Sequence, residues 1–253
     1  MCLDISYYST LELLDDYFPD LIHDQEIEFD TDLNIHVLAM GYKRYPVILS
    51  TNGQYHRNFF EWCIIASYMD TPEKIRMQRA KMANARSEKI MDKSSWWHRI
   101  RKNRCLVPVT GIYEHRAIPG WKNKVPYYIH QAGRTIYFLP ALYYYNPNVP
   151  SNIETGEVTG MFAIVTRQAN SLMKQIHNDG DNKWRMPLFL TEQLEKEWLN
   201  QDLTDVRLAE ILSFEVAPES LVATPVWSIR TAKSRPDGKL KNEIFSWPNL
   251  PGL

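Results

Sequence analysis

The chain of 253 residues carries a net charge of −1, with 44% hydrophobic and 23% charged residues. This balance is typical of a globular protein, and the length suits one large domain or two small ones. The near-zero charge excludes a global basic field, so a nucleic-acid site has to be a local patch. Cys2, Cys63 and Cys105 are too few for a disulfide framework and too scattered for a zinc site, and we expect neither metal nor cofactor.

We do not expect the N-terminal residues to act as a secretory signal. The stretch MCLDISYYSTLELLDDYF lacks a basic region, and acidic residues interrupt its apolar ones. No stretch of the sequence approaches the roughly 18 consecutive apolar residues of a membrane span. The few cysteines suit a reducing compartment, so we predict a cytoplasmic protein without membrane contact.

The predicted helices and strands follow one another irregularly. A capping box at 9–12 predicts a first helix that ends at Pro19. Asn52-Gly53 predicts a tight turn, and Thr71-Pro72 predicts the start of a second helix. Runs rich in β-branched and aromatic residues predict strands at 36–40, 45–50, 61–66, 105–110, 125–131, 135–145, 161–166, 188–190 and 221–227. Further helices are predicted at 169–176, 191–199 and 205–212.

These elements predict a fold class. Residues 125–131 and 135–145 have the pattern of a hairpin, and 146–160 is a loop rich in Pro, Asn and Gly. Because there is no regular βαβ alternation, we predict an α+β single domain with a mainly antiparallel β-sheet or barrel-like core and flanking helices. The domain is expected to cover 1–230, followed by a polar, Pro-rich and loosely ordered tail at 231–253.

Lysine and arginine concentrate in two neighbouring segments, 74–93 and 96–104. The ordinary interpretation of such runs is a solvated helix face. The second segment also contains Trp96 and Trp97, interleaved with basic residues. Cations that neutralise phosphates beside aromatic rings that stack on bases are typical of a groove for single-stranded nucleic acid.

The second residue of the chain is a cysteine. If Met1 is removed, which a small second residue permits, Cys2 carries an α-amine and a thiol on neighbouring carbons. The amine titrates near ~7.7–8.0 and the thiol near ~8.5, so both nucleophiles are partly available at neutral pH. The ordinary alternative is a thiol without special function.

Three further polar sites stand in apolar surroundings. Glu114 lies at the end of an apolar strand, where a carboxylate is costly without a partner or a function. His177 ends an apolar helix, and Asn84, Arg86 and Glu88 bring an amide, a guanidinium and a carboxylate into one short stretch. Each also has an ordinary structural interpretation when taken singly. Glu114 is then a member of an ion pair, His177 a helix C-cap and Asn84 a helix end.

Together these motifs resemble a known family. Met1-Cys2, the stretch Asn84-Ala85-Arg86-Ser87-Glu88, the strand Arg104–Glu114, and Ile176-His177-Asn178 with Arg185-Met186-Pro187 occur in the order found in the SRAP family. These are the SOS response-associated peptidases, or abasic site processing proteins. The resemblance extends from Met1 to about Trp227, and four motifs in the same order make it specific.

The resemblance implies a protein of the DNA damage response that binds single-stranded DNA and captures abasic sites. The α-amine of Cys2 would condense with the open sugar aldehyde, and its thiol would close a thiazolidine ring. The implied peptidase activity would then be self-removal of Met1. The implied catalytic residues are Cys2, Glu114, His177 and Asn84. The implied DNA-binding residues are Arg86, Arg185, Thr166, Trp96 and Trp97. We expect a monomer that associates with the nucleoid when it acts.

The sequence departs from the family pattern near the nucleophile. Leu3-Asp4-Ile5 stands where Gly-Arg-Phe is usual, so an acid replaces a base. His36 stands where Asn is usual, and His115 stands where Trp often follows the glutamate. The segment between His177 and Arg185 is long, which puts the placement of Arg185 in question.

Two other functions are compatible with the same residues. One is a cysteine peptidase acting in trans, with Cys2, His177 and Glu114 as nucleophile, base and orienting group; Cys2 would then work with Met1 retained. The other is a non-catalytic binder of single-stranded nucleic acid that uses the basic segments within 74–104. Its binding would be salt-sensitive, would survive loss of Cys2 and would not prefer abasic sites.

Overall fold

The computed structural model describes residues 2–25, 27–146, 158–231 and 233–253. The helices are α1 Leu13–Tyr17, α2 Pro72–Gln78, α3 Ser87–Ile90, α4 Trp96–Arg99, α5 Ser171–Ile176, α6 Glu192–Trp198 and α7 Asp205–Ser213. The strands are β1 Asp4–Ser6, β2 Ile22–His23, β3 Val37–Leu38, β4 Arg44–Thr51, β5 Gln54–Trp62, β6 Asn84–Arg86, β7 Arg104–Val109, β8 Gly111–Arg116, β9 Val125–Gln131, β10 Tyr137–Tyr144, β11 Met161–Gln168, β12 Arg185–Pro187 and β13 Leu221–Pro225. No helix in the described part of the chain is long and apolar enough to cross a membrane.

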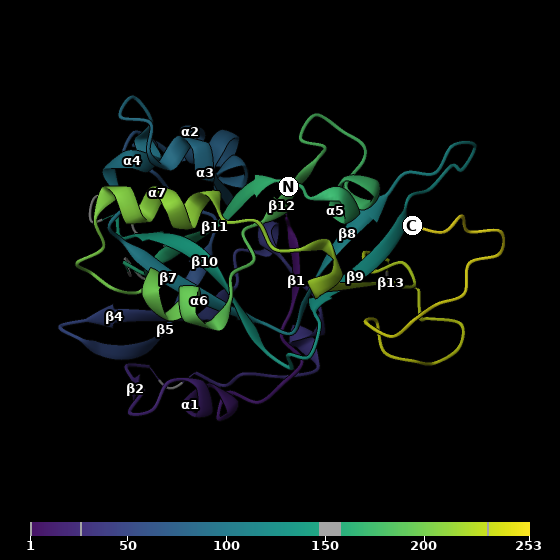
Figure 1. Cartoon of the computed structure of the whole chain (residues 1–253), viewed down its shortest axis with the longest axis horizontal. Coiled ribbons are helices and arrows are strands. Elements are labelled where there is room, and N and C mark those ends of the chain that lie inside the picture. Colours follow the sequence, from purple (N-terminus) through teal and green to yellow (C-terminus); the bar gives the residue numbers. More distant parts are fainter. Residues whose placement is uncertain (1, 26, 147–157, 232) are drawn as a thin grey trace.

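The larger sheet closes on itself. Its strands follow the order β12-β11-β10-β7-β4-β5-β2, with β6 added beside β11. A parallel pairing of β11 with β5, Met161 opposite Glu61, joins two strands that are not neighbours in this order. Strands β4, β5, β11, β10 and β7 therefore form a ring, which removes their open edges. Helices α6 and α7 lie against the outside of this ring (Figure 1).

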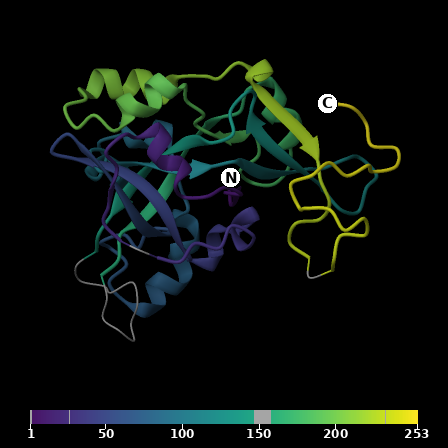
Figure 2. The ribbon, with the colours of Figure 1, turned by 90° about the horizontal axis from the view of Figure 1, so that it is seen from below.

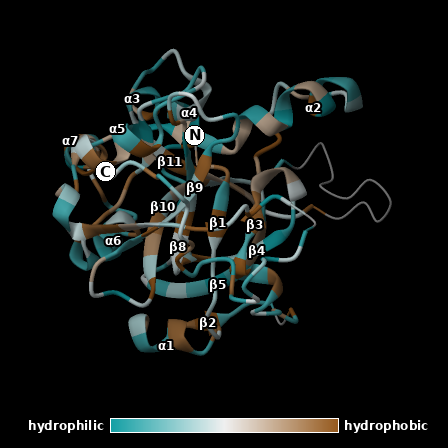
Figure 3. Cartoon of the chain, turned by 90° about the vertical axis from the view of Figure 1, so that its right-hand side faces the viewer, coloured by the Kyte–Doolittle hydropathy of each residue, from teal (hydrophilic) through white to brown (hydrophobic). Residues whose placement is uncertain are grey.

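The smaller sheet has the order β13-β9-β8-β1-β3, and all its pairings are antiparallel. Strand β1 lies between β8 and β3, near the middle of the view in Figure 3. Ile5 pairs with Ile112 and Ser6 with Gly111. Continuing this register places Leu3 opposite Glu114, so the start of the chain lies beside the carboxylate that the sequence singled out.

Gly111 occupies the tightest place along this pairing. A Cβ at Gly111 would lie 2.2 Å from ring atoms of Tyr128, whereas a Cβ at Gly41 would meet only Lys43 Cγ at 3.8 Å. We therefore expect Gly111→Ala to lower the free energy of unfolding by about 1–3 kcal/mol, because overpacking forces the ring or the strands to shift. Gly41→Ala, the matched control, should change it little. Urea unfolding of both variants tests this, and equal stability of the two would contradict it.

The predicted fold class is confirmed, and several local signals hold. Asn52 and Gly53, with φ of 52° and 78°, form the turn between β4 and β5, as expected of this pair. Thr71 and Thr191 both cap helices, accepting hydrogen bonds from the amides three residues later. The strands predicted at 45–50, 105–110 and 161–166 correspond to β4, β7 and β11.

The predicted hairpin at 125–145 is wrong. Strand β9 pairs with β8 and β13, while β10 pairs with β7 and β11, so the two strands belong to different sheets. The residues that connect β9 to β10 form hydrogen bonds with residues far away in the sequence. The Ala132 amide donates to Ser220 O at 2.9 Å, and Arg134 forms a bidentate pair with the buried Glu195 at 2.7 and 2.8 Å.

Other local predictions also need correction. The strand expected at 61–66 ends at Trp62, because Cys63 has a φ of 76° and leaves the extended conformation. The strand expected at 188–190 lies three residues earlier, in β12, and the one at 36–40 is only Val37–Leu38. The capping box at 9–12 does not form, since α1 begins at Leu13 with no side-chain cap.

The C-terminal segment packs beside the smaller sheet (Figures 1 and 2). The Trp247 indole donates to Val226 O at 3.0 Å and stacks on Trp227, with ring centres 5.3 Å apart. Arg116 of β8 donates to Pro251 O at 2.7 Å. Between 231 and 253, residue 232 apart, there is no helix or named strand. Most of the loop predicted at 146–160 lies outside the described residues.

Candidate active site

A pocket of about 320 Å³ lies where the start of β1, the end of β8 and the segment after α5 meet. Its lining residues are Leu3, Asp4, Glu114, His115, Lys124, His177, Asp179 and Arg230. They come from parts of the chain that are more than 200 residues apart. The pocket thus brings together Glu114 and His177 with the two residues that follow Cys2.

Cys2 is held by Asn84. The Asn84 side-chain amide donates to Cys2 O at 2.9 Å, although the two residues are 82 positions apart. Asn84 is fixed because β6 pairs with β11, Asn84 opposite Ile164. Its Oδ1 is buried and accepts no hydrogen bond among the described residues. The Cys2 side chain is fully buried, and Met1 lies outside the described residues.

Glu114 is a buried carboxyl group with an unused acceptor. It is only 5% exposed, and its Oε1 has no hydrogen-bond partner in the described part of the chain. Burial raises the pKa of Glu114 to about 8, so the group is largely protonated at neutral pH. Burial raises the pKa of the Cys2 thiol well above its ordinary value, and Glu114 raises it further once that carboxyl group is ionised. The resting sulfur is therefore a thiol.

His177 follows α5 as its C-cap residue. Its Nδ1 lies 2.9 Å from Arg185 O and 3.2 Å from Arg185 N, so either tautomer finds a backbone partner there. Burial lowers the pKa of His177 to about 4, which leaves the imidazole neutral at pH 7. A neutral imidazole lining the pocket can accept or donate a proton, according to the tautomer.

The long segment from Asn178 to Trp184 does not displace Arg185. The Trp184 amide donates to His177 O at 2.7 Å, so the segment closes on the residue where it began. Arg185 then pairs with Gln168 at the start of β12. The extra residues therefore form a side loop (Figure 1), and the contact between His177 and Arg185 is kept.

Arg185 is occupied by partners within the protein. It is 5% exposed and contacts Glu88 at 2.6 and 3.0 Å through two nitrogens. It also donates to the backbone oxygen of the buried Thr166 at 2.8 Å. Arg86, in contrast, is exposed and donates to Asn182 Oδ1 at 2.7 Å. Of these three candidates for DNA contact, the exposed Arg86 is the best placed to reach a ligand.

The Glu88–Arg185 pair predicts a stability effect. Glu88→Ala leaves the buried guanidinium without its carboxylate, and an uncompensated buried charge is strongly destabilising. We expect a loss of about 1–3 kcal/mol in the free energy of unfolding, moderated because Glu88 itself is half exposed. Glu192→Ala, which removes an exposed pair with Lys196, should cost under about 1 kcal/mol. Thermal unfolding of both variants distinguishes these values, and equal losses would show that the buried pair carries no special weight.

Trp96 and Trp97 lie on α4 and are half buried. Their rings pack edge to face, with centres 5.4 Å apart, and Trp96 makes a similar contact with Tyr144. The Trp96 indole donates to Ser67 Oγ at 3.1 Å. The basic segment around them divides among several short elements and is not one continuous helix. A role for either ring in DNA binding stays a prediction.

Asp4, which departs from the family pattern in the sequence, has charged partners in the structure. It is buried and accepts hydrogen bonds from His36 Nε2 at 2.8 Å and Arg230 Nε at 2.9 Å. Burial alone would raise the pKa of Asp4, but the bonds from His36 and Arg230 lower it overall. Position 4 holds an acid where the family usually has a base, and Arg230 supplies a cation to the pocket in its place. Such a pairing, across 226 residues, leaves no local signal in the sequence.

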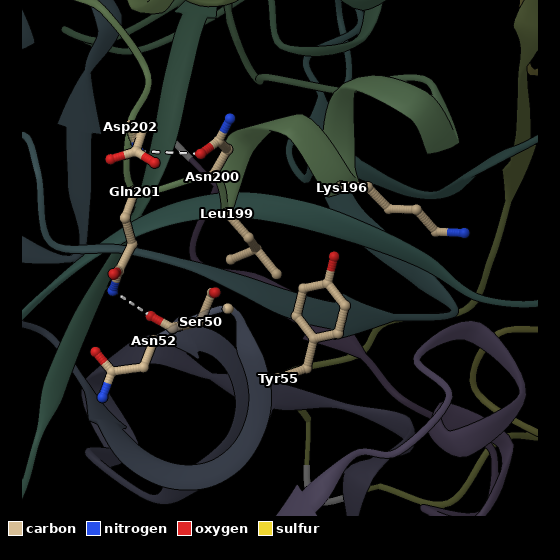
Figure 4. Close-up of a pocket in the computed structure, with 9 residues that line it drawn as sticks. Ser50, Asn52, Tyr55, Lys196, Leu199, Asn200, Gln201 and Asp202 are labelled. Carbon is tan, nitrogen blue, oxygen red and sulfur yellow. Dashed lines mark hydrogen bonds between the residues drawn. The ribbon is translucent and has the colours of Figure 1, made fainter.

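A second pocket, of about 380 Å³, lies between the β4–β5 turn and the end of α6 (Figure 4). Tyr55 and Lys196 line it, and Gln201 donates to Ser50 O at 2.6 Å at its edge. It shares no residue with the first pocket or with the predicted site. Among the described residues, no group of three His, Cys, Asp or Glu side chains is arranged to hold a metal ion.

Comparison with known proteins identifies the family. The sequence model of the SOS response associated peptidases (SRAP) matches residues 1–229. The chain belongs to the SRAP family. Two relatives from Bacillus subtilis strain 168 are named abasic site processing proteins. YoqW is 33% identical over 125 residues, which are 49% of this chain and 50% of YoqW. YobE is 29% identical over 149 residues, 59% of this chain and 63% of YobE.

Solved structures share the fold of this chain. A crystal structure of a protein from Bacteroides thetaiotaomicron has a TM-score of 0.74 and 30% sequence identity, and the match covers 96% of this chain and 97% of that one. A protein from Bordetella bronchiseptica, at 19% identity and a TM-score of 0.68 over 89% and 99% of the two chains, shares the fold. The match with YoqW spans about half the length of that relative, whereas the fold match is nearly complete.

Proposed function

We propose that this SRAP protein captures abasic sites in single-stranded DNA by forming a thiazolidine at Cys2 after removal of Met1. The observation that carries the proposal is the arrangement of Asn84, Cys2 and Glu114. The Asn84 amide donates to the backbone oxygen of Cys2. Glu114, whose Oε1 has no hydrogen-bond partner among the described residues, lies on β8 opposite Leu3, the residue that follows Cys2. The names of the relatives from Bacillus subtilis support the same substrate.

The first covalent step is condensation of the Cys2 α-amine with the aldehyde of the open sugar. The nitrogen attacks the carbonyl carbon to give a carbinolamine, which loses water to form an imine. Loss of the hydroxyl needs a proton, and the protonated Glu114 is suited to donate it. The largely neutral state of Glu114 at pH 7, caused by burial, matches this role.

The second step closes the ring. The nitrogen keeps its N–H proton when water leaves, so the imine is protonated. The Cys2 thiol loses its proton as the sulfur adds to the imine carbon, the C=N electron pair returns to the nitrogen, and one water leaves in the whole reaction. Because the thiol is buried and its pKa is raised, it needs a base at this stage. Glu114, ionised by its earlier donation, is suited to accept that proton. One carboxyl group thus serves both steps.

His177 is proposed to open the sugar ring. The neutral imidazole takes the proton of the 1′-hydroxyl and returns a proton to the ring oxygen, which frees the aldehyde. Its contacts with the Arg185 backbone fix the ring plane beside the pocket. Asn84 Oδ1 is available to accept a hydrogen bond from a sugar hydroxyl or the amine. Arg86 is proposed to contact a neighbouring phosphate.

The two other functions are less well supported. A cysteine peptidase acting in trans needs the Cys2 thiolate for its first attack, and burial raises the pKa of that thiol; the thiazolidine route begins with the α-amine and needs the sulfur only for ring closure. A purely non-catalytic binder leaves the unpaired Glu114 oxygen without a use. We therefore assign the peptidase part of the family name to self-removal of Met1. We propose that the protein acts as a cytoplasmic monomer in the DNA damage response.

A covalent band tests the function. The protein is incubated with single-stranded oligonucleotides that are identical except for one abasic site, and the products are heated and separated under denaturing conditions. We expect a stable adduct with the abasic oligonucleotide alone. Its intact mass should equal the protein without Met1 plus the oligonucleotide, less one water. Protein that lacks Met1 and still forms no adduct would contradict the proposal.

A further inference from the structure

The loop between α5 and β12 carries an exposed tryptophan in an unfavourable backbone conformation. Trp184 is 47% exposed, and its φ of 62° lies in the left-handed region. Bulky residues rarely adopt this conformation, and residues held there are found preferentially at functional sites. Neither burial nor backbone preference explains a tryptophan at this position.

The surrounding structure holds Trp184 in place. Its amide donates to His177 O at 2.7 Å, and its carbonyl accepts from the Ala169 amide at 2.9 Å. At the other end of the loop, Asn178 exchanges two hydrogen bonds with the Ala117 backbone, at 2.8 and 2.9 Å. Asn182 accepts from Arg86 at 2.7 Å. The indole is therefore presented from an ordered loop, which lowers the entropic cost of binding a ligand against it.

The loop is continuous with the pocket. His177 and Asp179 both line the pocket, and Trp184 bonds directly to the His177 backbone. The Lys183 ammonium lies 4.4 Å from the centre of the Trp184 ring, and the exposed Arg86 contacts the same loop through Asn182. The loop carboxylate of Asp179 is paired with Lys124 at 2.8 Å. An exposed indole with one cation over its ring and a second cation bound to the same loop is complementary to a base and its phosphates.

We propose that Trp184 stacks on the base adjacent to the abasic nucleotide, with Lys183 and Arg86 contacting the neighbouring phosphates. The proposal rests on the function above, in which the pocket holds the abasic sugar. A nucleotide beside an abasic site has lost the base that stacked on one of its faces. The indole replaces that lost stacking partner. The site thereby favours abasic strands over intact ones, in which the face of the neighbouring base is already covered.

A fluorescent base next to the lesion tests the proposal. Abasic oligonucleotides carry 2-aminopurine on the 5′ or the 3′ side of the abasic site, and its emission is followed as protein is added. Stacking on the wild-type indole should quench the emission on one of the two sides. Trp184→Phe should keep most of the quenching, whereas Trp184→Leu, which is apolar but has no ring, should lose it. Dissociation constants should rise roughly tenfold in Trp184→Leu, as expected when one base loses its stacking partner.

Controls separate this role from a structural one. Val206→Ala, at an exposed apolar position on α7, should leave both quenching and affinity unchanged. Trp184→Asn suits the left-handed backbone and should unfold at the same or a higher temperature than wild type, while DNA binding falls. Trp184→Leu that still forms the adduct with wild-type quenching and affinity would overturn the stacking proposal. Wild-type quenching without any adduct would overturn the covalent chemistry and support the stacking.

Discussion

Cys2→Ala is expected to form no heat-stable adduct with abasic single-stranded DNA. The thiazolidine ring needs an amine and a thiol on neighbouring carbons, and alanine supplies only the amine. Cys2→Ser keeps the amine and a poorer nucleophile, so it should give an imine that appears on gels only after reduction with borohydride. Denaturing gels with and without borohydride distinguish a ring from an imine. Both variants keep a small second residue, so removal of Met1 should be unaffected and is checked by intact mass.

Cys105→Ala is the matched control for this prediction. Cys105 lies on β7, is as fully buried as Cys2 and does not line the pocket. The variant should form the adduct at the wild-type rate at any temperature where it is folded. A persistent heat-stable adduct in Cys2→Ala would show that the nucleophile is another residue. Loss of the adduct in folded Cys105→Ala would show that cysteine loss acts through the fold.

Glu114→Gln is expected to slow adduct formation about 100-fold or more, the usual range for loss of a general acid–base group. Glutamine keeps the shape and the hydrogen bonding of a protonated carboxyl group but transfers no proton. In the wild type, the rate should fall as the pH rises through about 8, because Glu114 then loses the proton that it donates. Single-turnover rates between pH 5.5 and 9.5 test this. If the rate of adduct formation by Glu114→Gln still falls at high pH as it does in the wild type, the titrating group is a residue other than Glu114.

The same substitution should change how stability depends on pH. Folded Glu114 keeps its proton up to about pH 8, whereas the unfolded chain releases it near the ordinary value of 4.5. Between these values the folded state binds more protons, so the free energy of unfolding falls with rising pH, by at most about 1.4 kcal/mol per unit. Glu114→Gln removes this decline and should exceed wild type in stability more at pH 8 than at pH 5. Glu28→Gln, at an exposed position, should show no such difference in urea unfolding.

The residues of the candidate site stood out in the sequence because they are polar in apolar surroundings. Glu114 ends a buried run, and burial explains both its raised pKa and its unpaired oxygen. His177 ends an amphipathic helix, as its position in α5 shows. The distances between these residues could not be predicted from the sequence around each of them. Asn84 reaches Cys2 only because β6 joins β11, and that pairing depends on the closed ring of strands.

The placement of charged groups could not be predicted in the same way. Arg185 was expected to contact DNA, and the structure pairs it with Glu88 across 97 residues. Asp4 looked unfavourable for an anionic ligand, and the structure pairs it with Arg230 and His36. Trp184 carries no functional signal in the sequence, because neither its exposure nor its left-handed backbone conformation can be read from the residues around it. Ion pairs form between side chains that folding brings together, so their partners are unknown until the chain topology is known.

The sequence by itself determined the α+β class, the Asn52-Gly53 turn, the caps at Thr71 and Thr191, and the polar residues of the site. These features depend on interactions within a few residues, which composition and spacing record directly. The tertiary structure alone decided that β9 and β10 belong to different sheets and that β11 closes a ring with β5. Strand pairing satisfies backbone groups irrespective of side-chain identity, so similar strands have several possible partners. The choice among them is made by the packing of the whole core, and that packing places Leu3, the residue after Cys2, beside Glu114.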